Sequence, residues 1–462
     1  MSRWQFVIFL AVAVVARGQS AGQLSDAERE HKAALATCDP QQCPELPVIL
    51  NGLGGLYYEL GRYNDAEPLL LRAVELLRRT DREGRLLPAA LSNLAAVYRI
   101  RGRFTEAKSL YDQARNLQGS EQSFDGGDRL ESASLLVRLA LLTKDMGDLA
   151  GAAELTRSAL AVLTRNGAED TAEGARALAT WAAILEAQGH PQEAEQELKR
   201  ALAICERISG PDDISVADEL NTLGISYSHR TRWVEAEASL RRSVAILRMY
   251  PPLPLLASAL NNLGSVWLAQ GRKKEAEASI RQAVATWELL LGPDHPNVAA
   301  GLTNLAASLQ ARGRDEEAAR MLDRARAIDQ ENFSADHPRI GIDLSRAGAL
   351  AKSRKRYVEA EDLLRRAYTI LESALPPTDQ ELGVAALNLA DVLRLQKQLD
   401  SSAEMYQRGL KIVTSAWGPN DPRLAFWLDG YVSVLRDRKE FAEAARLEIQ
   451  ATRIRVTKTL HN

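Results

Sequence analysis

The chain is poor in the side chains that enzymes and metalloproteins most often use for chemistry. Its 462 residues include three cysteines and six histidines, and aromatic residues make up 5%. No histidine lies at metal-binding spacing from another histidine or from a cysteine, and there is no glycine-rich phosphate loop or GxSxG elbow. We therefore expect no catalytic residue, no metal site and no cofactor. A glycan- or peptide-acting site assembled across several segments stays an alternative.

Charge of one sign is also lacking. Lysine and arginine total 58 and aspartate and glutamate total 61, so the formal net charge is −3. This balance excludes a general preference for nucleic acids or anionic membranes. Most carboxylates lie near lysine or arginine on helical surfaces, as Glu195 lies near Lys199, and solvated helix faces are the expected interpretation.

What the chain does have is an internal repeat. Ten small residues, here called the anchors, recur at a mean spacing of 42 residues. A period of this size indicates stacked units rather than one globular core. The anchors are Ala66, Ala107, Ala152, Ala194, Ala236, Ala276, Ala318, Ala360, Ser402 and Ala444.

Each unit has the pattern of two helices joined by a tight turn. An apolar residue lies thirteen positions before each anchor, and a small residue lies seven positions after it. Within each half of the unit, the apolar and small residues recur at offsets of three, four and seven, which are helical spacings. Five positions before the anchor, six units have glycine, which can take the left-handed conformation that ends a helix. The other four units have Thr231, Lys355, Lys397 and Lys439, where we expect strain or a different cap.

This pattern resembles the tetratricopeptide repeat. Segments such as LNNLGSVW at Leu260 and loops such as GPDHPNVA at Gly292 are similar to the 42-residue repeat of kinesin light chains and their bacterial relatives. The resemblance covers about residues 48 to 457. It implies an all-α fold, a right-handed superhelical solenoid of about ten antiparallel helix pairs, in which the first helix of each pair lines a concave groove.

The N-terminal residues are typical of a secretory signal. Met1 to Arg3 is short and basic, Phe6 to Ala16 is apolar, and small residues follow. We expect cleavage after Gly18, with Ala16 or Ala21 as alternative sites. The apolar run is shorter than the roughly 18 residues that a membrane anchor needs. The predicted organisation is a signal peptide at 1–18, a capping segment with a short helix at 19–47, the repeat array at 48–458 and a tail at 459–462. The mature protein is thus expected to be exported, periplasmic or secreted, with no membrane span.

If the protein is exported, its cysteines enter an oxidising compartment where disulfides can form. Cys38 and Cys43 lie just before the first repeat, and in an oxidising compartment we expect a local disulfide between them. Closing so short a loop contributes about 2 kcal/mol on the chain-entropy model. A metal site is the alternative, but His31 is the only close histidine. Cys205 is expected to be buried and unpaired.

Two intervals between anchors depart from the period. The longest contains a glycine-rich stretch at Gly119 to Arg129, where a flexible loop is expected. The shortest contains Tyr250 to Pro254, a proline-rich and therefore stiff connection.

Helical phase places polar residues on the groove side of the first helices. The position fourteen before the anchor is Asn93, Asn262, Asn304 or Asn388 in four units. The resemblance implies that asparagines there hold a peptide backbone, since an amide both donates and accepts. The alternative is that they cap or solvate the helix. Further groove candidates are Asn221, Asn261, Arg346, Lys352 and Arg394. The cations among them would suit an acidic peptide.

These observations favour an exported, non-catalytic scaffold that binds an extended peptide or partner segment in its groove. The expected partner is a protein or peptide, not a nucleic acid, and the chain is expected to be monomeric. The competing hypothesis is a structural spacer of the cell envelope that self-associates.

Overall fold

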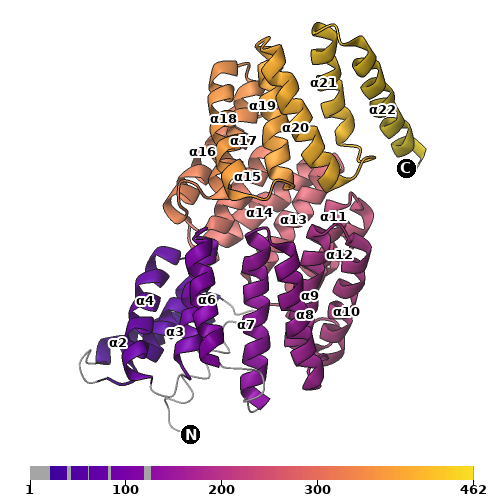
Figure 1. Cartoon of the computed structure of the whole chain (residues 1–462). Coiled ribbons are helices and arrows are strands. Elements are labelled where there is room, and N and C mark those ends of the chain that lie inside the picture. The colour runs from indigo at the N-terminus through magenta and orange to yellow at the C-terminus, as the bar shows by residue number, and fades with distance from the viewer. Residues whose placement is uncertain (1–20, 39–42, 61, 82–84, 119–125, 461–462) are drawn as a thin grey trace. The chain divides into compact units, whose positions relative to one another are not determined.

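The computed structural model describes residues 21–38, 43–60, 62–81, 85–118 and 126–460. Within these ranges every helix or strand assigned is an α-helix, and the helices α2–α22 follow one another through short connections (Figure 1). The chain divides into two compact units, residues 1–312 and 313–462, which are described separately. The predicted all-α architecture of consecutive helix pairs is confirmed.

Unit 1 begins with a single helix, followed by six helix pairs and one further helix. Their bounds are α2 Ala21–Thr37; α3 Leu46–Glu59 with α4 Tyr63–Thr80; α5 Leu87–Ile100 with α6 Phe104–Gln118; α7 Gly126–Asp145 with α8 Leu149–Arg165; α9 Ala172–Ala187 with α10 Pro191–Ser209; α11 Ile214–His229 with α12 Trp233–Leu247; α13 Pro254–Ala269 with α14 Lys273–Leu291; and α15 Pro296–Gln310.

Unit 2 begins with one helix and continues with three pairs. Their bounds are α16 Asp315–Asn332; α17 Pro338–Ser353 with α18 Tyr357–Ala374; α19 Gln380–Leu395 with α20 Leu399–Trp417; and α21 Leu424–Asp437 with α22 Phe441–Leu460. Odd-numbered helices from α3 are the first helices of their repeats, and even-numbered helices from α4 are the second helices.

The anchors hold the two helices of each repeat in close contact. Ala236 and Ala276 are fully buried, and Ser402 donates from its hydroxyl to the carbonyl of Ala390 at 2.7 Å. The small residue twelve positions before the anchor has the same role. A Cβ added to Gly264 would lie 2.5 Å from Cγ1 of Ile280 on the partner helix. The periodic small residues therefore set the distance between helices, and the large residues between them fill the core.

The turns inside the repeats confirm the expectation of strain. All four residues that replace glycine have a positive φ: 58° at Thr231, 60° at Lys355, 64° at Lys397 and 65° at Lys439. In one of these turns, Arg356 N–H donates to the Ala351 carbonyl and Lys355 N–H to the Lys352 carbonyl, both at 2.9 Å. This is the bonding that ends a helix when its final residue is left-handed.

The loops between repeats position the next helix through side-chain caps. Asp213 accepts from the backbone N–H of Ser215 at 2.9 Å, and the Nδ1 atom of His295 accepts equivalently from Asn297 at 2.9 Å. His337 caps α17 in the same way, through the N–H of Arg339 at 3.1 Å. Two of the six histidines thus act as helix caps where other repeats use aspartate.

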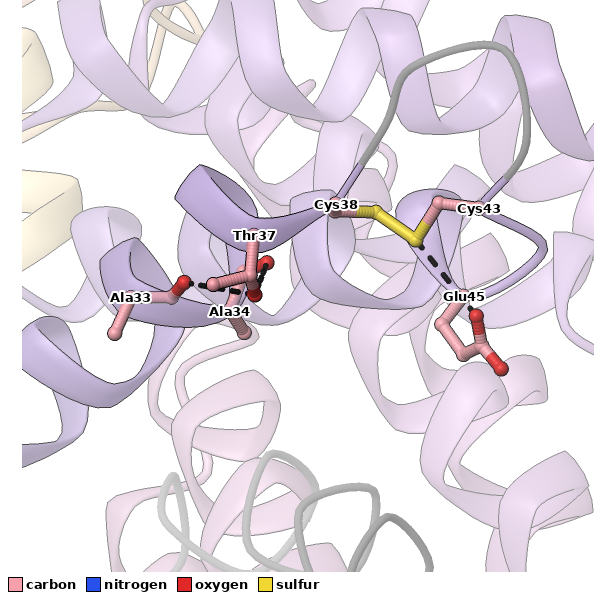
Figure 2. Close-up of a disulfide and its surroundings, with 6 residues drawn as sticks. All are labelled: Ala33, Ala34, Thr37, Cys38, Cys43 and Glu45. Carbon is pink, nitrogen blue, oxygen red and sulfur yellow. Dashed lines mark hydrogen bonds between the residues drawn. A yellow bond between two sulfur atoms is a disulfide. The ribbon is translucent and has the colours of Figure 1, made fainter.

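The helix before the first repeat imitates a second helix. Ala27 of α2 is buried like an anchor, and the adjacent Glu28 accepts from Tyr57 at 3.2 Å and from Arg62 at 2.9 Å. A disulfide joins Cys38, just after α2, to Cys43, with their Cα atoms 5.5 Å apart (Figure 2). The capping segment is therefore a half repeat that covers α3.

In several repeats, and in the capping segment after Ala27, a carboxylate that directly follows the buried small residue bonds to the next repeat. We call Glu28, Glu67, Glu195, Glu237 and Glu277 the junction carboxylates. Glu237, for example, accepts from the Trp267 indole at 3.0 Å and from Arg272 at 2.8 Å. The interpretation of Glu195 as part of a solvated face was wrong, because its side chain is only 12% exposed and it bonds across the junction.

Some sequence predictions fall outside the described residues. The predicted signal peptide lies within residues 1–20, and residues 119–125 of the predicted flexible loop are not described either. Residues 126–129, the remainder of that predicted loop, form the start of α7. Cys205 is a buried free cysteine. In the described part of the chain, no helix combines the length and apolarity that crossing a bilayer requires.

Candidate functional site

Within each unit, most successive first helices contact one another. In unit 1, α7 contacts α9 and α11 contacts α13, and in unit 2, α17 contacts α19. Among the described helices, no comparable contact links successive second helices. Because neighbouring repeats approach more closely on the first-helix side, that side is the concave one in each unit. We call it the inner face.

Three pairs of asparagines connect successive first helices across the inner face of unit 1. In each pair, the asparagine fourteen positions before one anchor donates from Nδ2 to the Oδ1 atom of an asparagine in the preceding repeat. The pairs are Asn93 with Asn51 at 3.1 Å, Asn262 with Asn221 at 2.9 Å, and Asn304 with Asn261 at 3.1 Å.

The two members of a pair have different environments. Asn221 and Asn261 are each only 7% exposed, so their amides serve to hold the partner rather than to reach a ligand. Asn262 and Asn304 are half-buried and use one N–H in the pair. An amide also has a second N–H and a carbonyl oxygen, which these pair bonds do not use.

The asparagine pairs give these residues a contact between repeats that neither predicted role included, and the peptide contact stays a prediction. The amides neither cap their own helices nor simply solvate them. Each is held by a neighbouring repeat, which fixes its direction along the face. The sequence signal was the recurrence of asparagine at fifteen and fourteen positions before successive anchors, and Asn51, the first such residue, was missed.

The inner face of unit 2 has no such pair among its described residues. Asn388 is half-buried on α19 and its amide has no hydrogen-bond partner in the described chain, while the preceding repeat has Ser345 in place of the holding asparagine. Arg346, on α17, is exposed. Asn388 and Arg346 are therefore separate polar groups rather than parts of a bonded row.

Two of the three cations predicted for the groove share one carboxylate. Lys352 and Arg394 both bind Asp391, at 2.9 and 2.6 Å, and Arg99 binds Asp145 at 2.5 Å. Burial alone would raise the pKa of Asp391, but Lys352 and Arg394 outweigh it and lower that pKa. Asp391 therefore offsets part of the positive charge predicted for the groove, which weakens the expectation of an acidic peptide.

The middle of the inner face of unit 1 has two neighbouring carboxyl groups and one cation. Asp218 and Glu219 lie on α11, and Arg176 on α9 is the cation that acts on both. Burial, and then the charge of Asp218, raise the pKa of Glu219 to about 8. At neutral pH Glu219 is therefore mostly protonated and able to donate a hydrogen bond.

A second carboxyl pair lies in the core of unit 2. Asp329 of α16 is 2% exposed and accepts from Arg339 at 3.0 Å, and Asp343 of α17 is 6% exposed. Burial first, and the charge of Asp329 second, raise the pKa of Asp343 to about 7. No group of three or more histidines, cysteines or carboxylates suited to a metal ion occurs in the described residues.

Comparison with known proteins agrees with this architecture. The sequence model of the tetratricopeptide repeat matches residues 45–120, 86–165, 170–249, 255–331, 298–373 and 381–455. The matches span well over half of the sequence, and the chain belongs to the tetratricopeptide repeat family.

Individual relatives are more distant. Tetratricopeptide repeat protein 19, mitochondrial, from Rattus norvegicus is 34% identical over 95 residues, which are 20% of this chain and 26% of that protein. The chain thus matches only about a quarter of that relative's length. Kinesin light chain TPR-like repeats from Podosopora anserina are 24% identical, with a TM-score of 0.37 over 43% of this chain and 94% of theirs.

A third protein is similar over most of the chain. The structure of Rap protein complexed with Competence and Sporulation Factor has a TM-score of 0.54 and 13% identity, and the alignment covers 81% of this chain and 99% of the other. Together these findings establish a repeat scaffold of a family that binds protein partners and is generally non-catalytic.

Proposed function

We propose that this protein is a non-catalytic scaffold that holds an extended segment of a partner protein along the inner face of unit 1. The observation that carries the proposal is the set of three asparagine pairs. Each orients an amide whose remaining N–H and carbonyl can bond a peptide backbone; Asn262 and Asn304 lie one repeat apart, and Asn93 lies four repeats before Asn262. Backbone recognition of this kind depends little on the ligand's side chains.

The surroundings of the pairs support a segment that is not strongly acidic. Asp218 and Glu219 lie on the same helix, α11, as Asn221, and Arg99 is matched by Asp145. These charges do not favour a strongly acidic segment over a neutral or basic one. The Rap protein structure, which has a similar fold, contains a bound factor, so an array of this architecture can hold a partner.

Export is part of the proposal. The basic start and apolar run at Phe6 to Ala16 support a secretory signal, and the Cys38–Cys43 pair suits an oxidising compartment. Expression of the full chain with a C-terminal tag, followed by fractionation and N-terminal sequencing of the mature protein, tests this step. A tagged product that begins at Met1 and stays in the cytoplasm would contradict it.

The groove is tested by partner capture with two matched variants. Asn262→Ala with Asn304→Ala removes the free amides of two pairs. Ser243→Ala removes a buried hydrogen bond of 2.7 Å to Ala217 in the same unit and leaves the inner face unchanged. Proteins crosslinked to the purified mature protein in its native extract are identified by mass spectrometry for each variant.

The expected result is that the double asparagine variant loses the captured partner, whereas Ser243→Ala keeps it. Capture that survives the double change contradicts the groove hypothesis. Equal loss from both variants would assign the effect to stability, and would contradict it as well.

A further inference from the structure

A cleft of about 470 Å³ lies on the opposite side of unit 1, between second helices. Helices α12 and α14 form its walls and α13 its floor. The floor consists of Leu260, Leu263 and Trp267, and the small side chains of Ala245 and Ala278 leave the walls low. The cleft is mainly apolar and falls within the usual range of ligand sites, roughly 300–1,000 Å³.

Corresponding places in other repeats are closed by a bond between the walls. Arg242 of α12 bonds Glu206 of α10 at 2.7 Å, and Arg408 of α20 bonds Glu372 of α18 at 3.4 Å. Between α12 and α14 the equivalent residues are Arg248 and Gln282. No hydrogen bond joins these two side chains, although both are described, and the cleft stays open.

The short interval between anchors explains the opening. Helix α12 has 15 residues and ends at Leu247, whereas α10 and α14 each have 19. The proline-rich stretch from Tyr250 to Pro254 follows at once and starts α13. Arg248 therefore lies at the C-terminal end of the shortened helix α12. The equivalent residue Glu206 lies within the longer helix α10, where it reaches Arg242 of the next second helix.

The cleft has one cation in excess. Arg241 binds Glu237 at 2.7 Å, and Glu275 is paired with Arg272, so these four charges cancel. Arg248 is exposed and makes no ion pair within the described chain. An apolar floor beside one unmatched guanidinium complements a ligand that joins a large apolar group to a single carboxylate.

We propose that this cleft is a second docking site, which takes an apolar side chain and an adjacent aspartate or glutamate from a partner protein. The apolar side chain lies over Leu260 and Leu263 beside Trp267, and the carboxylate binds Arg248. The site is separate from the asparagine pairs, which use the inner face. It gives the scaffold two faces with different preferences, one for backbone and one for an acidic–apolar motif.

A library of displayed seven-residue peptides, selected on the purified protein, tests this proposal. Ala278→Phe fills the cleft with a large side chain. Because Ala278 is exposed, this substitution should not disturb the core. Ala238→Phe is the matched control, because Ala238 is the equivalent residue of the preceding junction, which the Arg242–Glu206 pair closes. Circular dichroism checks that both variants fold.

The expected result is that the unchanged protein and Ala238→Phe enrich peptides with an apolar residue next to an acidic one, and Ala278→Phe does not. Arg248→Gln should weaken the best peptide about tenfold, and replacing that peptide's carboxylate by its amide should do the same. Asn262→Ala with Asn304→Ala should leave its affinity unchanged.

Three outcomes overturn the proposal. One is identical enrichment by Ala278→Phe and the unchanged protein. Another is no acidic–apolar enrichment together with dodecanoate binding that Ala278→Phe blocks, which would assign the cleft to a lipid. The third is self-association that Ala278→Phe abolishes, seen as concentration-dependent light scattering, which would assign it to a second copy.

Discussion

Arg232 donates from Nη1 to the carboxylate of Glu195, 2.6 Å away, across the junction between two repeats. The same carboxylate accepts from Arg230 and from the hydroxyl of Tyr227. Burial alone would raise the pKa of Glu195, but the bonds from Lys199, Arg230 and Tyr227 outweigh it and lower the pKa to about 2. This junction therefore depends on an ionised glutamate.

Glu195→Gln should destabilise the protein by about 2 kcal/mol at pH 7, because the largely buried Arg230 loses its charged partner. Urea denaturation followed by circular dichroism measures the change. Glu235→Gln is the matched control, since Glu235 pairs with the same Arg232 at the surface, and it should change stability by no more than about 0.5 kcal/mol. Equal losses of stability in the two variants would show that the bonds of Glu195 across the junction stabilise the protein no more than a surface ion pair does.

The low pKa of Glu195 also predicts how the stability of the protein changes in acid. The folded-state pKa is lower than that of an unfolded glutamate, about 4.3, so its contribution is complete above that pH and is lost as the pH falls toward 2. The difference in unfolding free energy between the unchanged protein and Glu195→Gln should therefore shrink between pH 5 and pH 2. A difference that is constant over this range would contradict the assignment.

Asp343 should give the opposite dependence. Its pKa is raised to about 7, so the folded protein retains a proton that the unfolded chain releases near pH 4. The free energy of unfolding should fall as the pH rises from about 4 to 7 and then level off. The groups that face Asp343 are Asp329 of α16 and Arg339 and Arg346 of α17.

Asp343→Asn retains the shape and removes the titration, so the variant should be more stable than the unchanged protein at pH 8, by about 1–3 kcal/mol. Unfolding free energies at pH 5, 6, 7 and 8 measure both effects. Asp362→Asn changes an exposed carboxylate of α18 and should leave the pH profile as it is. A profile that Asp343→Asn does not flatten would be evidence against a protonated Asp343.

The left-handed lysines offer a gain in stability. Lys355 has a φ of 60° and an exposed side chain, so glycine at this position removes backbone strain and disturbs no core contact. Lys355→Gly should raise the free energy of unfolding by about 0.5–1 kcal/mol. The reverse test is Gly271→Ala, where φ is 81° and no atom obstructs the new Cβ, so any loss, about 1 kcal/mol, comes from the backbone alone. Thermal denaturation measures both.

Reduction of the Cys38–Cys43 bridge should act locally. On the chain-entropy model its loss costs about 2 kcal/mol, and faster amide hydrogen exchange should be confined to α2 and α3. Alkylation of the denatured, unreduced protein should label Cys205 alone, and reduction beforehand should expose three thiols. Three labelled thiols without reductant would show that the bridge does not form.

Much of the fold was predictable because each repeat is a local structure. The anchors, the small residues and the turn positions all act within about 20 residues, so their spacing in one sequence suffices. The four left-handed positions, Thr231, Lys355, Lys397 and Lys439, were located in this way.

The contacts between repeats were harder to predict. The bond from Asn262 to Asn221 joins residues 41 apart, and the bond from Asn304 to Asn261 joins residues 43 apart, so neither matches the period of the sequence. Whether Lys352 faces a ligand or Asp391 depends on the register of one first helix against the next, which helical phase within a repeat does not determine.

The junction carboxylates also set how the protein would respond to force. Glu195, Glu237 and Glu277 occupy three successive junctions of unit 1, whereas the two junctions before them have Lys108 and Ala153 at the same position. If unit 1 were pulled at its ends, its junctions would therefore resist extension to different degrees. The segment from α6 to α9 would extend at low load, and the segment from α10 to α15 would stay intact until the load is higher.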